Sequence, residues 1–328
     1  MRLAIELSGE HPTLPRAEVY AAMAAEGVEV RAATFNARLL RLEVSGPAGR
    51  AVGRLGLAHL ASEEVAAGDF ETVRSFAREA DLEGRRFRVR AEGIGVDIDV
   101  RSLEGALGAD FARTGKVDLD RPEVEYRLLV GDEFVLGRVV HRMNRSRLEA
   151  RKVAKRSFTL PISLHPKLAR ALVNLARVPR TGTLLDPFCG TGGIVLEAAD
   201  IGIGALGTDR ARRMIVGTRR SMRALDLSAA LAVADAGLLP MRRGTIQGIA
   251  TDPPYGRAAS TRGEPIGRLY ARAFDSFAAV LPAGGHAAVV LPSPKAIEIA
   301  SARMELIERH ELRVHRSLVR HFCVFVTA

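Results

Sequence analysis

Three aspartates stand where short apolar runs end, a pattern that could hold a small ligand carrying amines and hydroxyls. Asp186 opens the segment DPFCGTGG, Asp209 ends GALGTD, and Asp235 ends AVAD. The glycines of the first segment let the backbone approach a ligand without a Cβ clash. Each aspartate taken alone would be an ordinary N-cap or turn residue. Three in succession, with the glycine turn, predict a nucleoside site.

The chemistry of these side chains indicates their roles. A carboxylate at position 186 would repel a pyrophosphate but suits an amine, and the segment lacks both the Gly-Lys-Ser/Thr of a phosphate loop and the start of a dinucleotide fingerprint. Asp209 is placed to accept hydrogen bonds from ribose hydroxyls, and Asp235 to meet a purine edge. The predicted ligand-binding residues are Asp186, Phe188, Gly190, Thr191, Gly192, Asp209 and Asp235. We add His165, although capping or packing is the commoner role for such a histidine.

A second motif, TDPPYG, follows the next apolar run. A Pro-Pro pair cannot continue a helix and holds the chain extended. The Asp252 carboxylate and the neighbouring carbonyls can therefore converge as acceptors beside the ring of Tyr255. Acceptors next to an aromatic ring suit the exocyclic amine of a flipped base. The predicted catalytic residues are Asp252, Pro253, Pro254 and Tyr255.

The elements that must position these motifs alternate between strand and helix from residue 157 onward. We expect strands at 184–187, 205–208, 229–234, 248–251 and 286–291, and helices at 192–200, 214–225 and 269–280. Such alternation predicts a parallel sheet covered on both faces, with ligands at the carboxyl ends of its strands. Residues 1–140 read instead as an α+β half with mostly short strands. The 328 residues thus suggest more than one domain.

Composition favours a polyanionic partner. The chain has 48 basic residues, only five of them lysine, and a formal net charge of +10. Guanidinium groups bind phosphates as planar forks. A GC-rich genome would explain the preference for arginine over lysine, but not the excess over acidic residues. We therefore predict a nucleic-acid partner.

The most basic stretch, HRMNRSRLEARKVAKR (141–156), lies between the two halves. We interpret it as a linker that contacts phosphates; a solvated helix face is the alternative. The predicted RNA-binding residues are Arg142, Arg145, Arg147, Arg151 and Lys152.

Several classes of protein are disfavoured. With only Cys189 and Cys323, a disulfide framework and a cysteine zinc site are excluded, and we predict no metal. Neither an apolar run of membrane-spanning length nor a signal peptide is visible, so we expect a cytoplasmic protein.

DPFCGTGG, Asp209, Asp235 and TDPPYG together resemble the S-adenosylmethionine-dependent, Rossmann-like amino-methyltransferases. The stretch 158–177 is similar to the helix that precedes their glycine turn. The N-terminal segments FRVRAEGIG, SLEGALGADF and VDLDRPEVEYRLLVGDEFVLG resemble a THUMP domain behind a ferredoxin-like region. The whole chain is similar to the archaeal tRNA (guanosine-10 N2)-methyltransferase family.

The resemblance implies a division into a ferredoxin-like region (1–50), a THUMP-like domain (51–140), the basic linker (141–156) and a methyltransferase domain (157–328). It also implies methyl transfer from S-adenosylmethionine to N2 of a guanosine in tRNA, with position 10 favoured. The number of methyl groups added and the need for a small activator subunit stay open. The alternatives are an enzyme acting on another tRNA guanosine, a DNA amino-methyltransferase, and a non-catalytic tRNA-binding protein.

Overall fold

The computed structural model describes residues 1–151, 163–256, 263–315 and 318–328. Contacts within the chain group these residues into two compact units. Unit 1 comprises Met1–Glu10, Val28–Gly53 and Ala58–Met143. Unit 2 comprises His11–Gly27, Arg54–Leu57 and Asn144–Ala328.

Unit 1 is built on one mixed sheet of eight strands, in the order β2-β3-β1-β4-β8-β7-β5-β6. The strands are β1 (Arg2–Leu7), β2 (Val30–Asn36), β3 (Leu39–Val44), β4 (Ala58–Gly68), β5 (Arg86–Gly93), β6 (Lys116–Val117), β7 (Val124–Val130) and β8 (Phe134–Arg142). Its helices are α2 (Gly49–Val52), α3 (Phe70–Glu79) and α4 (Val100–Phe111). The α3 and α4 helices pack over β5 and β7, where the rings of Phe111 and Tyr126 stack with centroids 4.2 Å apart. The expected α+β character of this half is confirmed.

The two units defined by contacts within the chain have other boundaries than the four predicted parts. Strand β4 pairs with β1 on one side and β8 on the other, so residues on both sides of position 50 share one sheet. The α1 helix (Leu14–Ala25) belongs to unit 2, because its Leu14 and Ala21 lie in the same apolar core as the helix that follows His165. The predicted linker contains the end of β8 and a short helix, α5 (Arg145–Ala150).

A buried carboxylate explains why residues 54–57 also join unit 2. Glu18 of α1 is fully buried and accepts hydrogen bonds from the backbone N–H groups of Gly56 and Leu57, at 2.7 and 2.8 Å. It also accepts one from the Asn174 side chain at 2.7 Å. Buried charge is tolerated only when its hydrogen-bonding capacity is met. This network therefore fixes the segment against the helices.

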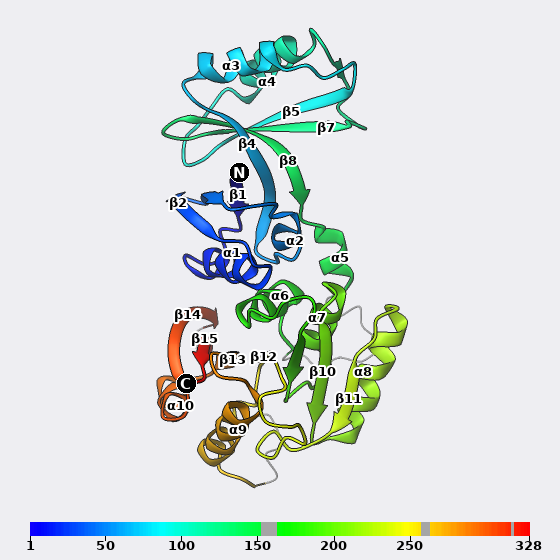
Figure 1. Ribbon diagram of the computed structural model, residues 1–328, viewed down its shortest axis with the longest axis vertical. Helices are drawn as coiled ribbons and strands as arrows, with labels where there is room; N and C mark the ends of the chain where they lie inside the picture. Colours follow the sequence, from blue (N-terminus) through cyan, green and yellow to red (C-terminus); the bar gives the residue numbers. More distant parts are fainter. Residues whose placement is uncertain (152–162, 257–262, 316–317) are drawn as a thin grey trace. The chain divides into compact units, whose positions relative to one another are not determined.

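Unit 2 is built on a seven-stranded sheet in the order β11-β10-β9-β12-β13-β15-β14 (Figure 1). The strands are β9 (Thr183–Asp186), β10 (Gly204–Asp209), β11 (Ala230–Val233), β12 (Gly248–Thr251), β13 (His286–Leu291), β14 (Glu305–His315) and β15 (Leu318–Val326). The first five are mutually parallel, whereas β15 runs antiparallel to both β13 and β14. The predicted parallel strands are confirmed, and the antiparallel pair at the edge is an addition.

Helices cover both faces of this sheet. They are α6 (Pro166–Leu175), α7 (Gly193–Asp200), α8 (Arg212–Ala224), α9 (Ile266–Val280) and α10 (Pro294–Ser301). Leu184 of β9 packs with α6 and α7, whereas its neighbour Leu185 packs with α9 and α10. Successive strand residues point to opposite faces, so both faces carry an apolar core. The predicted doubly wound fold is confirmed. No helix within the described ranges is long and apolar enough to cross a membrane.

Candidate active site

The glycine turn joins β9 to α7 and is fixed by backbone hydrogen bonds. The Cys189 N–H donates to the Thr208 carbonyl at 2.9 Å, and the Gly192 N–H donates to the Cys189 carbonyl at 2.7 Å. Gly190 and Gly192 have φ angles of +49° and +79°, in the region that favours glycine. A Cβ added at Gly192 would lie 2.4 Å from Cγ2 of Thr218, so this position has no room for a side chain.

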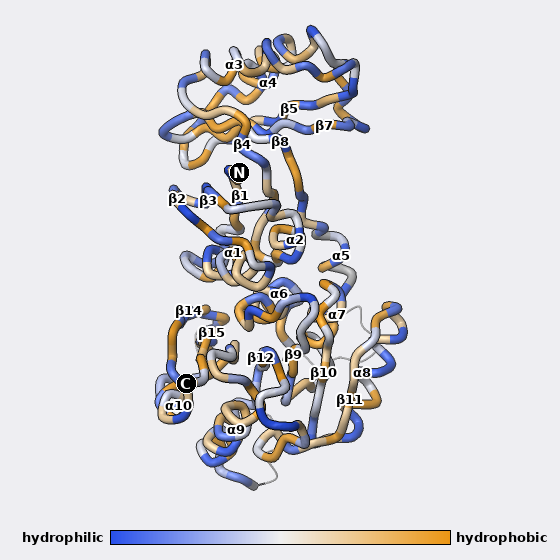
Figure 2. The backbone as a smooth tube through the Cα atoms, in the orientation of Figure 1, coloured by the Kyte–Doolittle hydropathy of each residue, from blue (hydrophilic) through white to orange (hydrophobic). Residues whose placement is uncertain are grey.

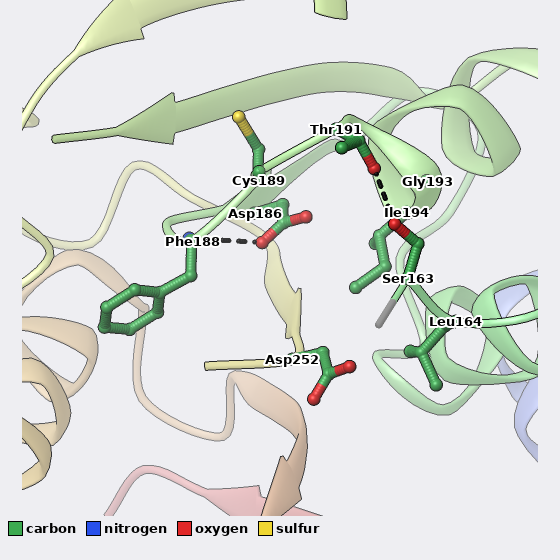
Figure 3. Close-up of a pocket in the computed structure, with 10 residues that line it drawn as sticks. Ser163, Leu164, Asp186, Phe188, Cys189, Thr191, Gly193, Ile194 and Asp252 are labelled. Carbon is green, nitrogen blue, oxygen red and sulfur yellow. Dashed lines mark hydrogen bonds between the residues drawn. The ribbon is translucent and has the colours of Figure 1, made fainter. Parts of the chain in front are cut away.

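Asp186 lies at the end of β9 with its carboxylate almost completely buried. One oxygen, Oδ1, accepts from the Phe188 N–H at 3.2 Å and from the Thr251 hydroxyl at 2.7 Å. The other oxygen points away from Phe188, toward the side of the pocket where Ser163 and Ile194 lie (Figure 3). Burial raises the pKa of Asp186 to about 7, and the nearby charges of Asp209 and Asp252 act in the same direction.

A pocket opens at this carboxylate. It is lined by Ser163, Leu164, Asp186, Phe188, Cys189, Gly190, Thr191, Gly193, Ile194 and Asp252 (Figure 3). The hydroxyl groups of Ser163 and Thr191 are hydrogen-bonded at 2.9 Å across it. Two carboxylates and hydroxyl groups among apolar side chains make it suitable for a cationic ligand with a polar end.

Asp209, at the end of β10, supports the glycine turn. Its Oδ2 accepts from the Gly190 N–H at 3.0 Å, and its Oδ1 accepts from the Ala211 N–H at 2.8 Å. Burial raises the pKa of the Asp209 carboxyl, while the two N–H donors act in the opposite direction. Each oxygen keeps acceptor capacity beyond these single bonds. The proposed contact with ribose hydroxyls therefore stays a prediction, and the observed role is to hold the turn.

Asp235 follows β11 and is paired with an arginine. Its Oδ1 accepts from the Gly237 N–H and its Oδ2 from the Arg272 guanidinium, both at 2.9 Å. Burial tends to raise the pKa of Asp235, but these two donors hold it below its usual value. Glu264 is a second partner of Arg272, at 2.9 Å. The predicted contact with a purine edge is not tested by this arrangement.

His165 is the N-cap of α6. Its Nδ1 accepts from the Lys167 N–H at 3.4 Å, and its backbone carbonyl accepts from Ala169 at 3.0 Å. Capping and cofactor contact were the two roles considered for His165 from the sequence, and the structure shows the capping role. Its neighbours Ser163 and Leu164, which were not predicted, line the pocket instead.

The TDPPYG motif continues from β12 and brings its carboxylate to the same pocket. The Tyr255 hydroxyl donates to Oδ1 of Asp252 at 2.6 Å, and the Tyr270 hydroxyl donates to the Pro254 carbonyl at 2.7 Å. Burial raises the pKa of Asp252 to about 6, opposed by the charge of Arg320 and the hydrogen bond from Tyr255. The carboxylate is thus ionised near neutral pH and close to its titration range. That is the property of an effective proton acceptor.

Arg320, on β15, is a site residue that sequence reasoning missed. Its guanidinium carbon lies 6.0 Å from the centre of the Tyr255 ring, at the outer limit of a cation–π contact. It supplies the positive charge that acts on Asp252. An arginine so far beyond the motif, on a strand with no ligand pattern, carries no local signal of this role.

Comparison with known proteins gives consistent results. A family model described as "RMKL-like, methyltransferase domain" matches residues 154–321. A protein of Methanothermobacter thermautotrophicus named tRNA (guanine(10)-N2)-dimethyltransferase is 34% identical, covering 98% of both chains. Its namesake from Pyrococcus abyssi is 31% identical, again covering 98% of both chains. The chain belongs to the tRNA (guanine(10)-N2)-dimethyltransferase family. The resemblance predicted from the motifs is confirmed.

The family fold extends to a solved bacterial relative. The crystal structure of TrmN from Thermus thermophilus matches with a TM-score of 0.53 at 24% identity, and all of each chain is covered. At this identity the match is informative about the fold, which agrees with the predicted combination of a methyltransferase sheet and an N-terminal α+β half.

The structure describes part of the basic linker, and one of its arginines is buried. Arg151 is buried, with its guanidinium 2.8 Å from Glu197 and 3.2 Å from Asp200. It therefore cannot reach a phosphate, and its assignment to RNA binding is corrected. Arg147 also pairs with Asp200, although its side chain is 59% exposed. The charge run alone gives no sign of these partners on α7.

The other predicted linker contacts are less well defined by the structure. Arg142, at the end of β8, is 53% exposed and pairs with Glu125 of the neighbouring strand. Lys152 and the side chain of Arg145 lie outside the described residues. Among the described residues, no group of three or more His, Cys, Asp or Glu side chains could hold a metal ion.

Proposed function

We propose that this protein transfers methyl groups from S-adenosylmethionine to the exocyclic N2 of guanosine 10 in tRNA, forming N2-methylguanosine and then the N2,N2-dimethyl product. Family membership supports the reaction, because full-length relatives carry the name tRNA (guanine(10)-N2)-dimethyltransferase. The single observation that carries the proposal is the Asp252 carboxylate, which lines the pocket with Asp186 and is held by Tyr255. A tRNA substrate is consistent with the expected cytoplasmic location.

The residues of the pocket fit the cofactor. The second oxygen of Asp186 points into the pocket and can accept from an ammonium group, and Ser163 and Thr191 offer hydroxyls for a carboxylate. A Cβ added at Gly190, which has a positive φ, would meet only the Phe188 carbonyl within 4 Å, so the pocket side of this residue is open to a ligand. When bound, S-adenosylmethionine supplies an electrophilic methyl group on a positively charged sulfur. Asp209 would bind the ribose through the acceptor capacity left beside the turn.

Asp252 and its neighbours would act on the guanine amine. The lone pair of this nitrogen is delocalised into the ring, which makes it a weak nucleophile. An ionised Asp252 and the Pro253 carbonyl would each accept a hydrogen bond from the amine. These two hydrogen bonds favour a pyramidal nitrogen with a localised lone pair. As the new N–C bond forms, the bond from this methyl group to sulfur would break, leaving S-adenosylhomocysteine, and the nitrogen would lose one proton to Asp252 or to water beside it. Tyr255 orients the carboxylate through its 2.6 Å hydrogen bond and offers a ring face to the base.

The test uses the purified full-length chain, isotopically labelled S-adenosylmethionine and two tRNA transcripts, one with guanosine and one with adenosine at position 10. We expect label in the first transcript only, and nucleoside mass spectrometry should identify N2-methylated guanosine. Asp252→Asn keeps the shape of the side chain and should abolish transfer while retaining cofactor binding. Label in both transcripts, or full activity of Asp252→Asn, would contradict the proposal.

A further inference from the structure

One face of helix α8 consists of arginines. Its sequence, RRMIVGTRRSMRA, places five of them on the exposed side. They are Arg212, Arg213, Arg219, Arg220 and Arg223. The residues between them, including Ile215 and Met222, are buried against α7 and the sheet. The backbone tube of α8 accordingly alternates between hydrophilic and hydrophobic stretches (Figure 2). The buried side fixes the rotation of the helix, so the arginines are held outward.

These arginines differ from most other described arginines because none of them forms an ion pair with a described carboxylate, although the charge of Arg213 does act on Asp209. Many arginines elsewhere form ion pairs, such as Arg74 with Asp110 and Arg272 with Asp235. Among the described residues, none of the five α8 arginines has a carboxylate oxygen within 4.0 Å (ion pairs at or below that distance all involve other residues). The same comparison shows that the basic linker, the most cationic stretch of the sequence, has partners for Arg142, Arg147 and Arg151. Helix α8 thus carries five arginines without an ion pair to a described carboxylate on one face.

The shape of this face also suits a ligand. A shallow hollow is lined by Arg212, Arg213, Val216, Gly217 and Arg220. Gly217 has no side chain, and it lies one turn after Arg213 and one turn before Arg220 in this lining. Val216, 38% exposed, is the one large apolar side chain in its lining. Several planar forks around a gap match a chain of phosphates better than the apolar surface of a protein.

We infer that the arginine face of α8 binds the sugar–phosphate backbone of the tRNA substrate. The inference rests on the proposed function, in which tRNA is the polyanionic substrate. It adds an RNA contact surface on unit 2. Thirteen residues of α8 span about 20 Å at ~1.5 Å per residue, enough for several phosphates. The contacts carry no base information and serve to position the RNA.

The face is rigidly connected to the glycine turn. The helix starts directly after Ala211, whose N–H donates to Asp209, and the Thr218 hydroxyl donates to the Gly190 carbonyl at 2.9 Å. Phosphates held on the outer side of α8 are therefore held at a fixed position relative to the pocket. Such positioning affects substrate affinity more than the chemical step.

The experiment compares two charge-matched double variants of the full-length chain. Arg219→Gln/Arg220→Gln removes two adjacent arginines from α8, and Arg242→Gln/Arg243→Gln removes two exposed adjacent arginines outside that helix. Binding of a tRNA transcript is measured over a series of salt concentrations. With roughly 0.7–0.9 per phosphate contact, the α8 variant should flatten the log–log slope by up to about 1.4–1.8. The control should keep the wild-type slope, and Arg219→Lys/Arg220→Lys should keep most of it.

The outcomes are distinct. Cofactor affinity should be unchanged in the α8 variant, because its two positions lie on the exposed side of the helix. A wild-type slope in a folded Arg219→Gln/Arg220→Gln protein would refute the inference and leave an acidic protein surface as the ligand that the face fits. Equal flattening in both double variants would also refute it, since net charge alone would then be responsible. If the wild-type protein binds tRNA through α8 but does not methylate it, the proposed function is overturned and this inference stands.

Discussion

Replacing Asp186 with asparagine should stabilise the protein in a pH-dependent way. The folded protein raises the pKa of this buried carboxyl from 3.8 to about 7. Well below pH 3.8 the group is protonated in both the folded and the unfolded chain, so its ionisation has no effect on stability. Between about pH 4 and 7 the unfolded chain releases the proton while the folded protein keeps it. Stability therefore falls as pH rises through this window.

The size of the effect follows from the shift. About three pKa units at ~1.36 kcal/mol each give an upper limit of about 4 kcal/mol, reached near pH 7 and constant above it. The asparagine of the Asp186→Asn variant would have no charge to bury, and its side-chain oxygen can still accept from the Phe188 N–H and the Thr251 hydroxyl. The stability gained by the substitution should thus grow from near zero at pH 4 to a few kcal/mol at pH 7.

Urea unfolding of the cofactor-free wild type and variant, at a series of pH values from about 4 to 8, measures this difference directly. Values at the acidic end serve as the internal control, because both folded proteins are then uncharged at position 186 and the unfolded wild type is only partly ionised. A stability difference that does not change with pH would refute the reasoning, since it would show that the folded protein does not disfavour the ionised carboxylate. The variant should also lose cofactor affinity, measured by calorimetry.

Three further predictions concern other residues. Arg320→Gln removes a positive charge near Asp252, so the pH at which the methylation rate reaches half its maximum should move upward from about 6. A pH–rate profile measures this midpoint, and an unchanged value would show that Arg320 does not act on Asp252. Asp209→Ala should weaken binding of S-adenosylhomocysteine by about 10-fold or more, given ~1.5–3 kcal/mol per charge-assisted hydrogen bond, and equal affinity in calorimetry would remove Asp209 from the cofactor site. Arg151→Gln leaves the buried Glu197 with less compensation and should reduce the free energy of unfolding by about 3 kcal/mol, whereas a change below ~1 kcal/mol would identify the pair as dispensable.

The grouping of Asp186 and Asp252 at one pocket could be predicted because a parallel sheet simplifies its geometry. Asp186 and Asp209 end their strands and Asp252 directly follows one, and the carboxyl ends of parallel strands meet at one edge. Identifying those strands was therefore enough to bring the residues together. The roles of individual atoms could not be obtained in this way. That Asp209 holds the Gly190 N–H, and that Asp235 pairs with Arg272, depends on contacts between segments distant in sequence.

Elements outside the parallel repeat were harder to predict. The β14 strand, ELIERHELRVH, is charged and mostly exposed because it lies at the sheet edge, so it lacks an apolar run. The packing of α1 in unit 2 could not be predicted from the sequence either. A glutamate on an amphipathic helix is expected to face solvent, and only the structure shows Asn174 and residues 54–57 around Glu18. Arg151 shows the same limit, because its partner Glu197 is 46 residues away.

The two pocket carboxylates connect protonation to cofactor binding. Asp186 and Asp252 are buried, and their pKa values are raised to about 7 and about 6. In the cofactor-free protein near neutral pH, a fraction of the Asp186 side chains is therefore protonated. An ammonium group binds the ionised carboxylate more strongly than the neutral carboxyl, so binding favours release of that proton. Cofactor affinity should consequently rise with pH up to about 7 and level off above it, and the heat of binding should depend on the ionisation enthalpy of the buffer. The burial that destabilises the empty protein thus favours a cationic ligand over a neutral one.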